Sequence, residues 1–310
     1  MNLVIVSESI FDVVSADIEC LPGTGKTNCC KRNYGMNISL DLRMSFCQEP
    51  IELPVFNPVA VDLLRLLNDP SMEIDNVVRM INEDQALSVQ VLKMSNSPAY
   101  AGRTKCETVR DSAMRLGTRQ ITSLVMAASQ ASLHTSENTV VDDVMQELWL
   151  HSHACALGCW SIAMKSGHQP LADQAYMAGL LHDIGKLYIL KAMERISRVK
   201  ENGIVLERAL LLNVFTEMHV EMGCRLMDYW NIPDIYRAIV ANHHSEEFDR
   251  NDTTLAIVRL VNFNSRDFNL SLNQPMDQTG EILPEVAVLK LDDTYREKLQ
   301  EVMVTSSCIQ

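Results

Sequence analysis

Five of the eight histidines in this chain stand in places where they could take part in chemistry. They are His151, the histidine of the pair His182-Asp183 in "LLHDIGKL", His219, and the pair His243-His244. Neutral imidazole nitrogens and a carboxylate are ligands that zinc, iron, manganese and nickel accept. Metals held in this way can activate water and bind phosphoryl oxygens. The residue types therefore indicate a metal site that could act on a phosphoester.

The spacing of these residues leaves a second interpretation open. The gaps between His151, His182, His219 and His243 are long, unlike the short spacings of a local zinc motif. On spacing alone, the same residues could be partly buried histidines that form hydrogen bonds at helix ends. Glu147 precedes His151 by four residues, so both side chains would lie on one helix face.

The elements that must position these residues are predicted to be helices. Hydrophobic residues make up 47% of the chain but aromatic residues only 5%, and 17 are methionine. Unbranched side chains lose little rotamer freedom in a helix, so this composition favours an all-α fold. From residue 51 onward the apolar residues follow a helical period. The predicted helical segments are 57–70, 73–84, 85–100, 107–117, 118–133, 142–167, 171–193, 206–215, 219–230, 234–244 and 254–268.

Breaks in this pattern predict the domain organisation. Residues 1–48 lack a helical period and are predicted to be an N-terminal extension, and residues 271–310 a C-terminal tail. The polar stretch "HTSENT" divides the rest into a helical part at 51–135 and a second part at 140–270. The segment "GTGKT" in the extension resembles a phosphate-binding loop, but Cys20 stands where that loop needs its first glycine.

Charge and cysteine content limit the classes of partner and compartment. The net charge is −13 and the pI about 5.1, so a basic face for nucleic acid is not expected. No apolar run reaches the length of roughly 20 residues that a membrane-spanning helix needs. The nine cysteines are odd in number and scattered, which favours reduced thiols in a cytoplasmic protein.

Taken together, the motifs resemble those of a known superfamily. The pattern His151 … His182-Asp183-Ile-Gly-Lys186 … His219-x3-Gly223 … Trp230-x2-Pro233 … His243-His244 resembles the HD superfamily of metal-dependent phosphohydrolases. It is similar both to HD-GYP cyclic-di-GMP phosphodiesterases and to the HDOD branch. The first half, with "LPVFNPVAVDLLRLLNDP", "INEDQALSVQVLKMSNSPAY" and "AMRLG", resembles HDOD proteins in particular. The resemblance covers about residues 51–270.

The resemblance implies a fold, a cofactor and a role for each matched residue. It implies a two-part all-helical fold, in which an N-terminal helical subdomain packs on an HD-type bundle. The cofactor would be one or two divalent transition metal ions: iron, manganese, nickel or zinc. The ligands would be His151, His182, Asp183, His219, His243 and His244, with Glu147 as a bridging ligand. Lys186 would contact the scissile phosphate.

Two departures from the catalytic pattern bear on activity. The late aspartate of that pattern is matched by Asn262 in "RLVNFNSR", and a neutral amide bridges cations less well than a carboxylate. The stretch "SEEFDRNDT" after His243-His244 lacks the Gly-Tyr-Pro loop of the cyclic-di-GMP enzymes. As a metal ligand, Asn262 would therefore favour a mononuclear or weakened site, and the missing loop argues against cyclic-di-GMP hydrolysis.

Two functions are therefore considered. The first is a bacterial HDOD module for signal transduction, which keeps its metal pocket and binds a signalling protein or a small phosphorylated ligand. The alternative is an active metal-dependent phosphohydrolase that acts on a nucleotide or another phosphoester, with Asp183 and Lys186 as catalytic residues. The sequence does not predict an oligomeric state.

Overall fold

A computed structural model describes residues 57–66, 73–100, 102–199, 205–272 and 283–306. Every regular element within these ranges is a helix, which confirms the predicted all-α class. The predicted N-terminal extension at 1–48, with its "GTGKT" segment, lies outside the described residues.

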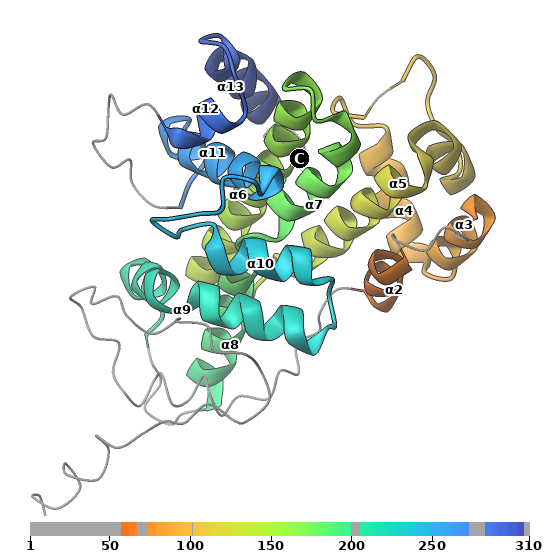
Figure 1. The fold of residues 1–310 in the computed structure, drawn as a ribbon. Helices are drawn as coiled ribbons and strands as arrows, with labels where there is room; N and C mark the ends of the chain where they lie inside the picture. The colour runs from red at the N-terminus through yellow and green to blue at the C-terminus, as the bar shows by residue number, and fades with distance from the viewer. Residues whose placement is uncertain (1–56, 67–72, 101, 200–204, 273–282, 307–310) are drawn as a thin grey trace, which may run out of the picture. The chain divides into compact units, whose positions relative to one another are not determined.

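The first group of helices forms around one long element. Three short helices pack on α5 (Val109–Leu133) (Figure 1). They are α2 (Pro58–Leu66), α3 (Ile74–Asn82) and α4 (Gln85–Ser95). All ten residues from Ile121 to Gln130 in α5 are buried. The second half of α5 also packs on α6 and α7, so it joins this group to the rest of the protein.

The kink in α5 lies where the sequence predicted a break between two helices. Gly117 has φ 79° and ψ 167°, a conformation that is essentially restricted to glycine. A capping box at Thr108 and Asp111 fixes the start of the first segment: each side chain accepts a hydrogen bond from the other residue's backbone N–H.

The second group of helices surrounds α6 (Thr139–Lys165). Every residue of α6 from His151 to Cys159 is buried, because several helices pack on it. The members of the group are α7 (Ala172–Leu181), α8 (Ile184–Val199), α9 (Arg208–Tyr229), α10 (Asp234–Asn242) and α11 (Thr253–Asp267), with a short 3₁₀ turn, η1 (Gln169–Leu171). The central position of α6 places His151 deep inside the protein.

Two predicted boundaries in this group were wrong. The continuous pattern at 171–193 is divided into α7 and α8, and the division falls at His182 and Asp183. The Nδ1 atom of His182 bonds to the carbonyl oxygen of Gly179 at the end of α7. Conversely, the segments predicted at 206–215 and 219–230 form the single helix α9. Apolar periodicity locates a buried face, but it does not show where one helix ends on that face.

Two further helices follow the predicted domain. The helix α12 (Pro284–Val288) packs on α11, and α13 (Tyr295–Ser306) packs on α6 and α11. Leu299 and Met303 of α13 are buried against Gly158 of α6. The C-terminal segment therefore contributes to the same core as the helix that carries His151.

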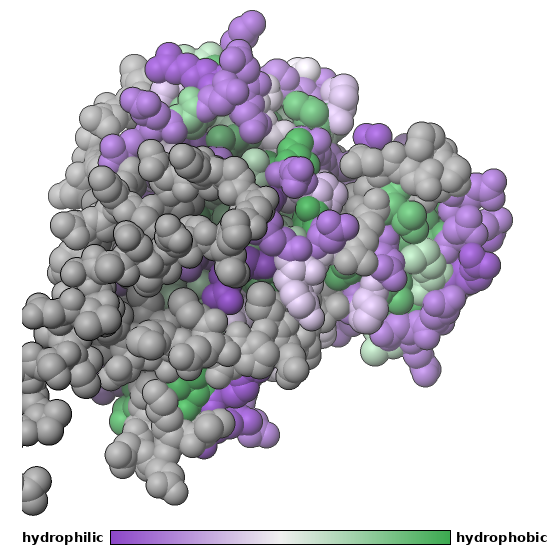
Figure 2. Space-filling view, turned by 60° about the horizontal axis from the view of Figure 1, so that its bottom comes forward, coloured by the Kyte–Doolittle hydropathy of each residue, from purple (hydrophilic) through white to green (hydrophobic). Residues whose placement is uncertain are grey.

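In the view of Figure 2, hydrophilic side chains cover much of the coloured surface. On the side formed by α2–α4, Figure 2 shows green apolar side chains between purple hydrophilic ones. Val89 of α4 is among the exposed apolar residues of this part. None of the helices in the described ranges combines the length and the hydropathy that crossing a bilayer requires.

A close helix crossing explains the glycine in "LLHDIGKL". A Cβ atom added to Gly185 in α8 would lie 1.8 Å from the carbonyl oxygen of His219 in α9. Gly223 of α9 faces the same crossing. Only glycine at position 185 therefore lets the backbone that follows Asp183 approach the helix that carries His219.

The substitution Gly185→Ala should disrupt this crossing. Because the added methyl group meets backbone atoms rather than a flexible side chain, we expect destabilisation of about 3 kcal/mol or more. Urea unfolding measures the loss. Gly102→Ala is the matched control, because the atoms nearest to its Cβ atom belong to the Arg115 side chain, at 3.1 Å, and not to the backbone. Equal stability of the two variants would contradict the prediction.

Candidate metal centre

Residues from four parts of the second helix group meet at one place. His151 comes from the middle of α6, His182 and Asp183 from the α7–α8 junction, and His219 from α9. The pair His243-His244 follows the end of α10. Two sets of side chains have ligand atoms within 4.8 Å of one another. One set is Asp183, His219, His243 and His244. The other set is His151, Cys155 and His182.

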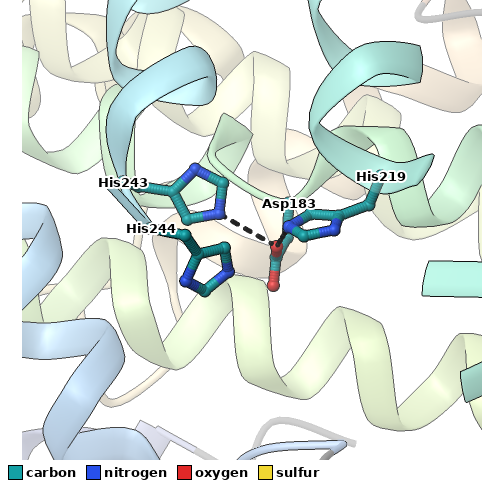
Figure 3. Close-up of side chains that lie close together, drawn as sticks. All are labelled: Asp183, His219, His243 and His244. Carbon is teal, nitrogen blue, oxygen red and sulfur yellow. Dashed lines mark ion pairs between the residues drawn. The ribbon is translucent and has the colours of Figure 1, made fainter. Parts of the chain in front are cut away.

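The carboxylate of Asp183 joins the two sets through its two oxygens. Its Oδ2 atom lies 3.2 Å from Nε2 of His151 and 3.3 Å from Nε2 of His182. Its Oδ1 atom lies 3.6 Å from Nε2 of His219 and 3.5 Å from Nε2 of His243. Figure 3 shows the rings of His219 and His243 directed at this carboxylate. One oxygen therefore faces each pair of imidazoles.

Backbone carbonyls fix the tautomer of all four imidazoles. Nδ1 of His151, His182, His219 and His243 lies 2.6–2.9 Å from a carbonyl oxygen. Those oxygens belong to Leu270, Gly179, Phe215 and Val240 respectively. A carbonyl can only accept, so each Nδ1 donates its hydrogen and each neutral ring keeps its lone pair on Nε2. Histidines that bind metals are typically oriented in this way.

The resulting arrangement places hydrogen-bond acceptors against one another. Nε2 of His151 lies 3.3 Å from Nε2 of His182, and each lies at nearly the same distance from Oδ2 of Asp183. Two ligands of a tetrahedral metal with bonds of about 2.0–2.1 Å lie roughly 3.3–3.4 Å apart. The three atoms thus have the spacing of one face of such a site.

The set formed by Asp183, His219, His243 and His244 contains buried polar atoms that have no hydrogen-bond partner. They are Oδ1 of Asp183 and Nε2 of His219 and His243. Such atoms are costly to bury, and here all three are acceptors that face one another. A cation would satisfy them together. The cluster therefore fits a divalent metal ion by its spacing and by its donor set.

Burial keeps the imidazoles in the form that binds metal. It lowers the pKa of His151 and of His243, and together with the charge of Lys186 it lowers the pKa of His219 to about 3. Burial alone would raise the pKa of Asp183, but Lys186 and the histidines hold it well below its usual range. Near neutral pH the cluster therefore offers an ionised Asp183 and neutral His151, His219 and His243 rings, and these three rings need not lose a proton to bind metal.

Two further predicted residues border the cluster. His244 is partly buried, with its ring centroid 4.1 Å from that of His243 and 5.1 Å from that of His219. The Nζ atom of Lys186 lies 2.5 Å from Oδ2 of Asp183. This ammonium group therefore neutralises the oxygen that faces His151 and His182.

Two predicted ligands lie apart from these contacts. The carboxylate of Glu147 is about half exposed and forms two hydrogen bonds with Arg208 of α9, at 2.6 and 2.8 Å. Asn262 is buried in α11, but among the described side chains its amide is not one of the groups that contact Asp183. The structure therefore does not bring Glu147 or Asn262 into the contacts of Asp183.

The sequence analysis missed one residue of the cluster. Cys155 is buried, and its Sγ atom lies 3.8 Å from both ring nitrogens of His151. Burial raises the pKa of this thiol, so it is neutral as it stands. Its position four residues after His151 on the same helix face was the available signal.

The other buried histidines form a separate group around Trp149. The ring of His153 stacks on Trp149 with centroids 5.1 Å apart, and the ring of His134 lies 5.7 Å from the indole at an angle of 50°. Both ring nitrogens of His153 lack hydrogen-bond partners. Burial lowers the pKa of His153 to about 4. The sequence analysis did not include His134 or His153 in the metal pattern, and the structure places both outside it.

Replacing His153 with phenylalanine should flatten the pH dependence of stability. In the unfolded chain this imidazole takes up a proton near pH 6.5, whereas the folded protein resists protonation down to about pH 4. The contribution of the neutral His153 ring to the free energy of unfolding is therefore fully present above pH 6.5 and is lost as the pH falls toward 4. Urea unfolding in the presence of chelator measures the free energy of unfolding at each pH. Between pH 6.5 and 4, His153→Phe should lose less of this free energy than the wild type, with a difference on the order of 3 kcal/mol. Parallel curves would contradict this.

Comparisons with known proteins agree with the fold and with the motif pattern. The HDOD domain family matches residues 53–246. An uncharacterised protein of Treponema pallidum is 23% identical over 220 residues, which are 68% of this chain and 42% of that protein. This chain therefore spans less than half of that relative's length.

Solved structures show the same fold. An HDOD domain protein of unknown function from Geobacter sulfurreducens has a TM-score of 0.68 at 22% identity, covering 87% of this chain and 97% of its own. A Shewanella amazonensis protein, provisionally named a metal-dependent phosphohydrolase, has a TM-score of 0.63 at 18% identity, covering 86% and 96%. Because the family match extends over more than half of the sequence, the chain belongs to the HDOD domain family.

Proposed function

We propose that this protein is an HDOD module for signal transduction that holds divalent metal in its histidine cluster. His151, His182 and Oδ2 of Asp183 would hold one ion. His219, His243, His244 and Oδ1 of Asp183 would hold a second. The observation that carries the proposal is the set of acceptor atoms in mutual contact, each with its lone pair fixed by a backbone hydrogen bond. Imidazole-rich sites of this kind suit zinc, iron, manganese or nickel.

The environment of Asp183 favours a binding role over turnover. The ligand set contains a single carboxylate, because Asn262 is neutral and Glu147 is paired with Arg208. Lys186 already forms an ion pair with Oδ2 of that carboxylate, so a metal ion at His151 and His182 would compete with the ammonium group. Because a bound metal ion and Lys186 would compete for the Asp183 carboxylate, metal binding would change the contacts of Lys186, as expected of a sensing site.

The proposed ligand is a small phosphorylated molecule or a signalling protein. Lys186 is the cation beside the cluster, and it suits a phosphoryl group. His244 is the partly exposed member of the histidine set, so a ligand would reach the cluster on its side. A protein partner could act by changing access to the same side.

Metal-dependent phosphohydrolysis is the second candidate. Its support is the division of the cluster into two sets on either side of one carboxylate, with Lys186 adjacent. Two bound ions would supply an activated water and a clamp for phosphoryl oxygens. The chain's own contribution would be the neutral imidazoles, the orienting carbonyls and the charge of Lys186.

Metal content tests the proposed centre directly. Protein purified without chelator should contain one or two transition metal ions per chain by elemental analysis. Asp183→Asn should reduce metal affinity at both positions, because this carboxylate faces both pairs of imidazoles. Glu147→Gln is the matched control and should keep the wild-type metal content, since Glu147 pairs with Arg208 at the surface. Wild-type protein without metal after reconstitution would rule out the centre.

Turnover separates the two candidate functions. A module for binding should hydrolyse a generic phosphodiester no faster than Asp183→Asn when both are loaded with manganese or iron. It should instead show a higher melting temperature in the presence of a phosphorylated ligand, as linkage requires. Hydrolysis by the wild type that disappears in both Asp183→Asn and His151→Gln would replace the signalling proposal with the enzymatic one.

A further inference from the structure

A largely buried arginine, Arg259, holds the turn that carries His243 and His244. Nη1 of Arg259 in α11 donates to the carbonyl oxygen of Ser245 at 2.6 Å and lies 3.4 and 3.5 Å from those of Asn242 and His243. These are carbonyls at and just beyond the C-terminus of α10, where helical partners are missing. A cation at this end of a helix is favourable.

The arginine is itself held from two other directions. Its Nε atom donates to Oε1 of Glu285 at 2.7 Å, and its guanidinium carbon lies 4.5 Å from the ring centroid of Phe248. The side chain of Arg259 is 14% exposed and that of Glu285 only 4%. The second carboxylate oxygen of Glu285 has no hydrogen-bond partner. Among the described residues, Arg259 is therefore the partner that balances this buried charge.

The position of the turn matters for the proposed metal centre. The ring of His243 takes its orientation from the carbonyl oxygen of Val240, in the last turn of α10. Its Nε2 atom lies 3.5 Å from Oδ1 of Asp183, and the ring of His244 stands beside it. A shift of this turn would move both imidazoles away from the carboxylate.

We infer that Arg259 and Glu285 are positioning residues for the His219–His243–His244 half of the metal centre, and that the C-terminal segment thereby controls its affinity. Both residues lie beyond the region that matches the family, 53–246. Glu285 belongs to α12, and the next helix, α13, packs on the helix that carries His151. The segment thus reaches both halves of the cluster. The inference rests on the proposed metal centre.

Metal titration of the full chain tests this role. Arg259→Met should weaken the affinity for the metal ion at His219, His243 and His244 by about 10–100-fold. This is the usual effect of losing a residue that orients a metal ligand. Glu285→Ala should weaken it in the same direction. Glu285→Gln keeps an acceptor for Nε of Arg259 and should recover most of the affinity. The ion at His151 and His182 should change much less, which a general loss of structure would not produce.

Asp228→Asn is the matched control, because it removes a more exposed ion pair, between Asp228 of α9 and Arg237 of α10, the helix that precedes His243. It should bind both ions as the wild type does. Thermal unfolding of each metal-free variant shows whether it is folded. If Arg259→Met does not fold, Glu285→Ala and Glu285→Gln decide the question. Folded Arg259 and Glu285 variants with wild-type affinity for both ions would overturn the inference.

A second measurement keeps this inference separate from the metal proposal. In metal-free protein labelled with ¹⁵N-histidine, the ring nitrogen signals should report the Nδ1-protonated form of His243. Glu285→Ala and Arg259→Met should average or shift that signal, while the signal of His182 stays in place. If the wild type binds no metal but the two variants show these signal changes, the metal centre alone is refuted. Unchanged signals in folded variants would refute the positioning role.

Discussion

The structure around the cluster depends on a fully buried carboxylate. The Asp183 side chain is inaccessible to solvent, and a charge in such a place must be compensated or it destabilises the fold. Lys186 compensates it from the same turn, and imidazoles arrive from α6, α9 and the end of α10. The glycine at 185 is needed because α8 and α9 must come into backbone contact for His219 to reach this carboxylate.

The imidazoles are oriented by two kinds of contact that differ in origin. His182, His219 and His243 bond to carbonyls three or four residues earlier, so local helix geometry fixes those rings. His151 bonds to the carbonyl oxygen of Leu270, which is 119 residues away and follows α11. The orientation of His151 therefore depends on the packing of α11 against α6. The helix α13 packs on both α6 and α11, so it supports the packing that orients this ligand.

This difference explains how much the sequence alone could predict. The types of His182, Asp183, His219 and His243 and their family pattern were enough to predict that they meet. The partner of Glu147 was not predictable, because Arg208 lies 61 residues away and only tertiary packing brings the two together. Cys155 was overlooked for the opposite reason: its signal was local, but a lone buried thiol resembles ordinary core packing. The helical class followed from composition, whereas the break at His182 did not.

The charge of the cluster also limits what can bind there. Among the described residues that contact one another at this site, Asp183 is the only anion, while Lys186 is a cation and burial keeps His151, His219 and His243 neutral. Each divalent ion would therefore add positive charge that the protein does not balance. An aspartate at position 262 would offset part of it, but the asparagine there cannot. A loaded centre consequently favours an anionic ligand, since an uncompensated charge in a buried site is unfavourable. That requirement supports a phosphorylated molecule over a neutral one, whether it is bound as a signal or hydrolysed.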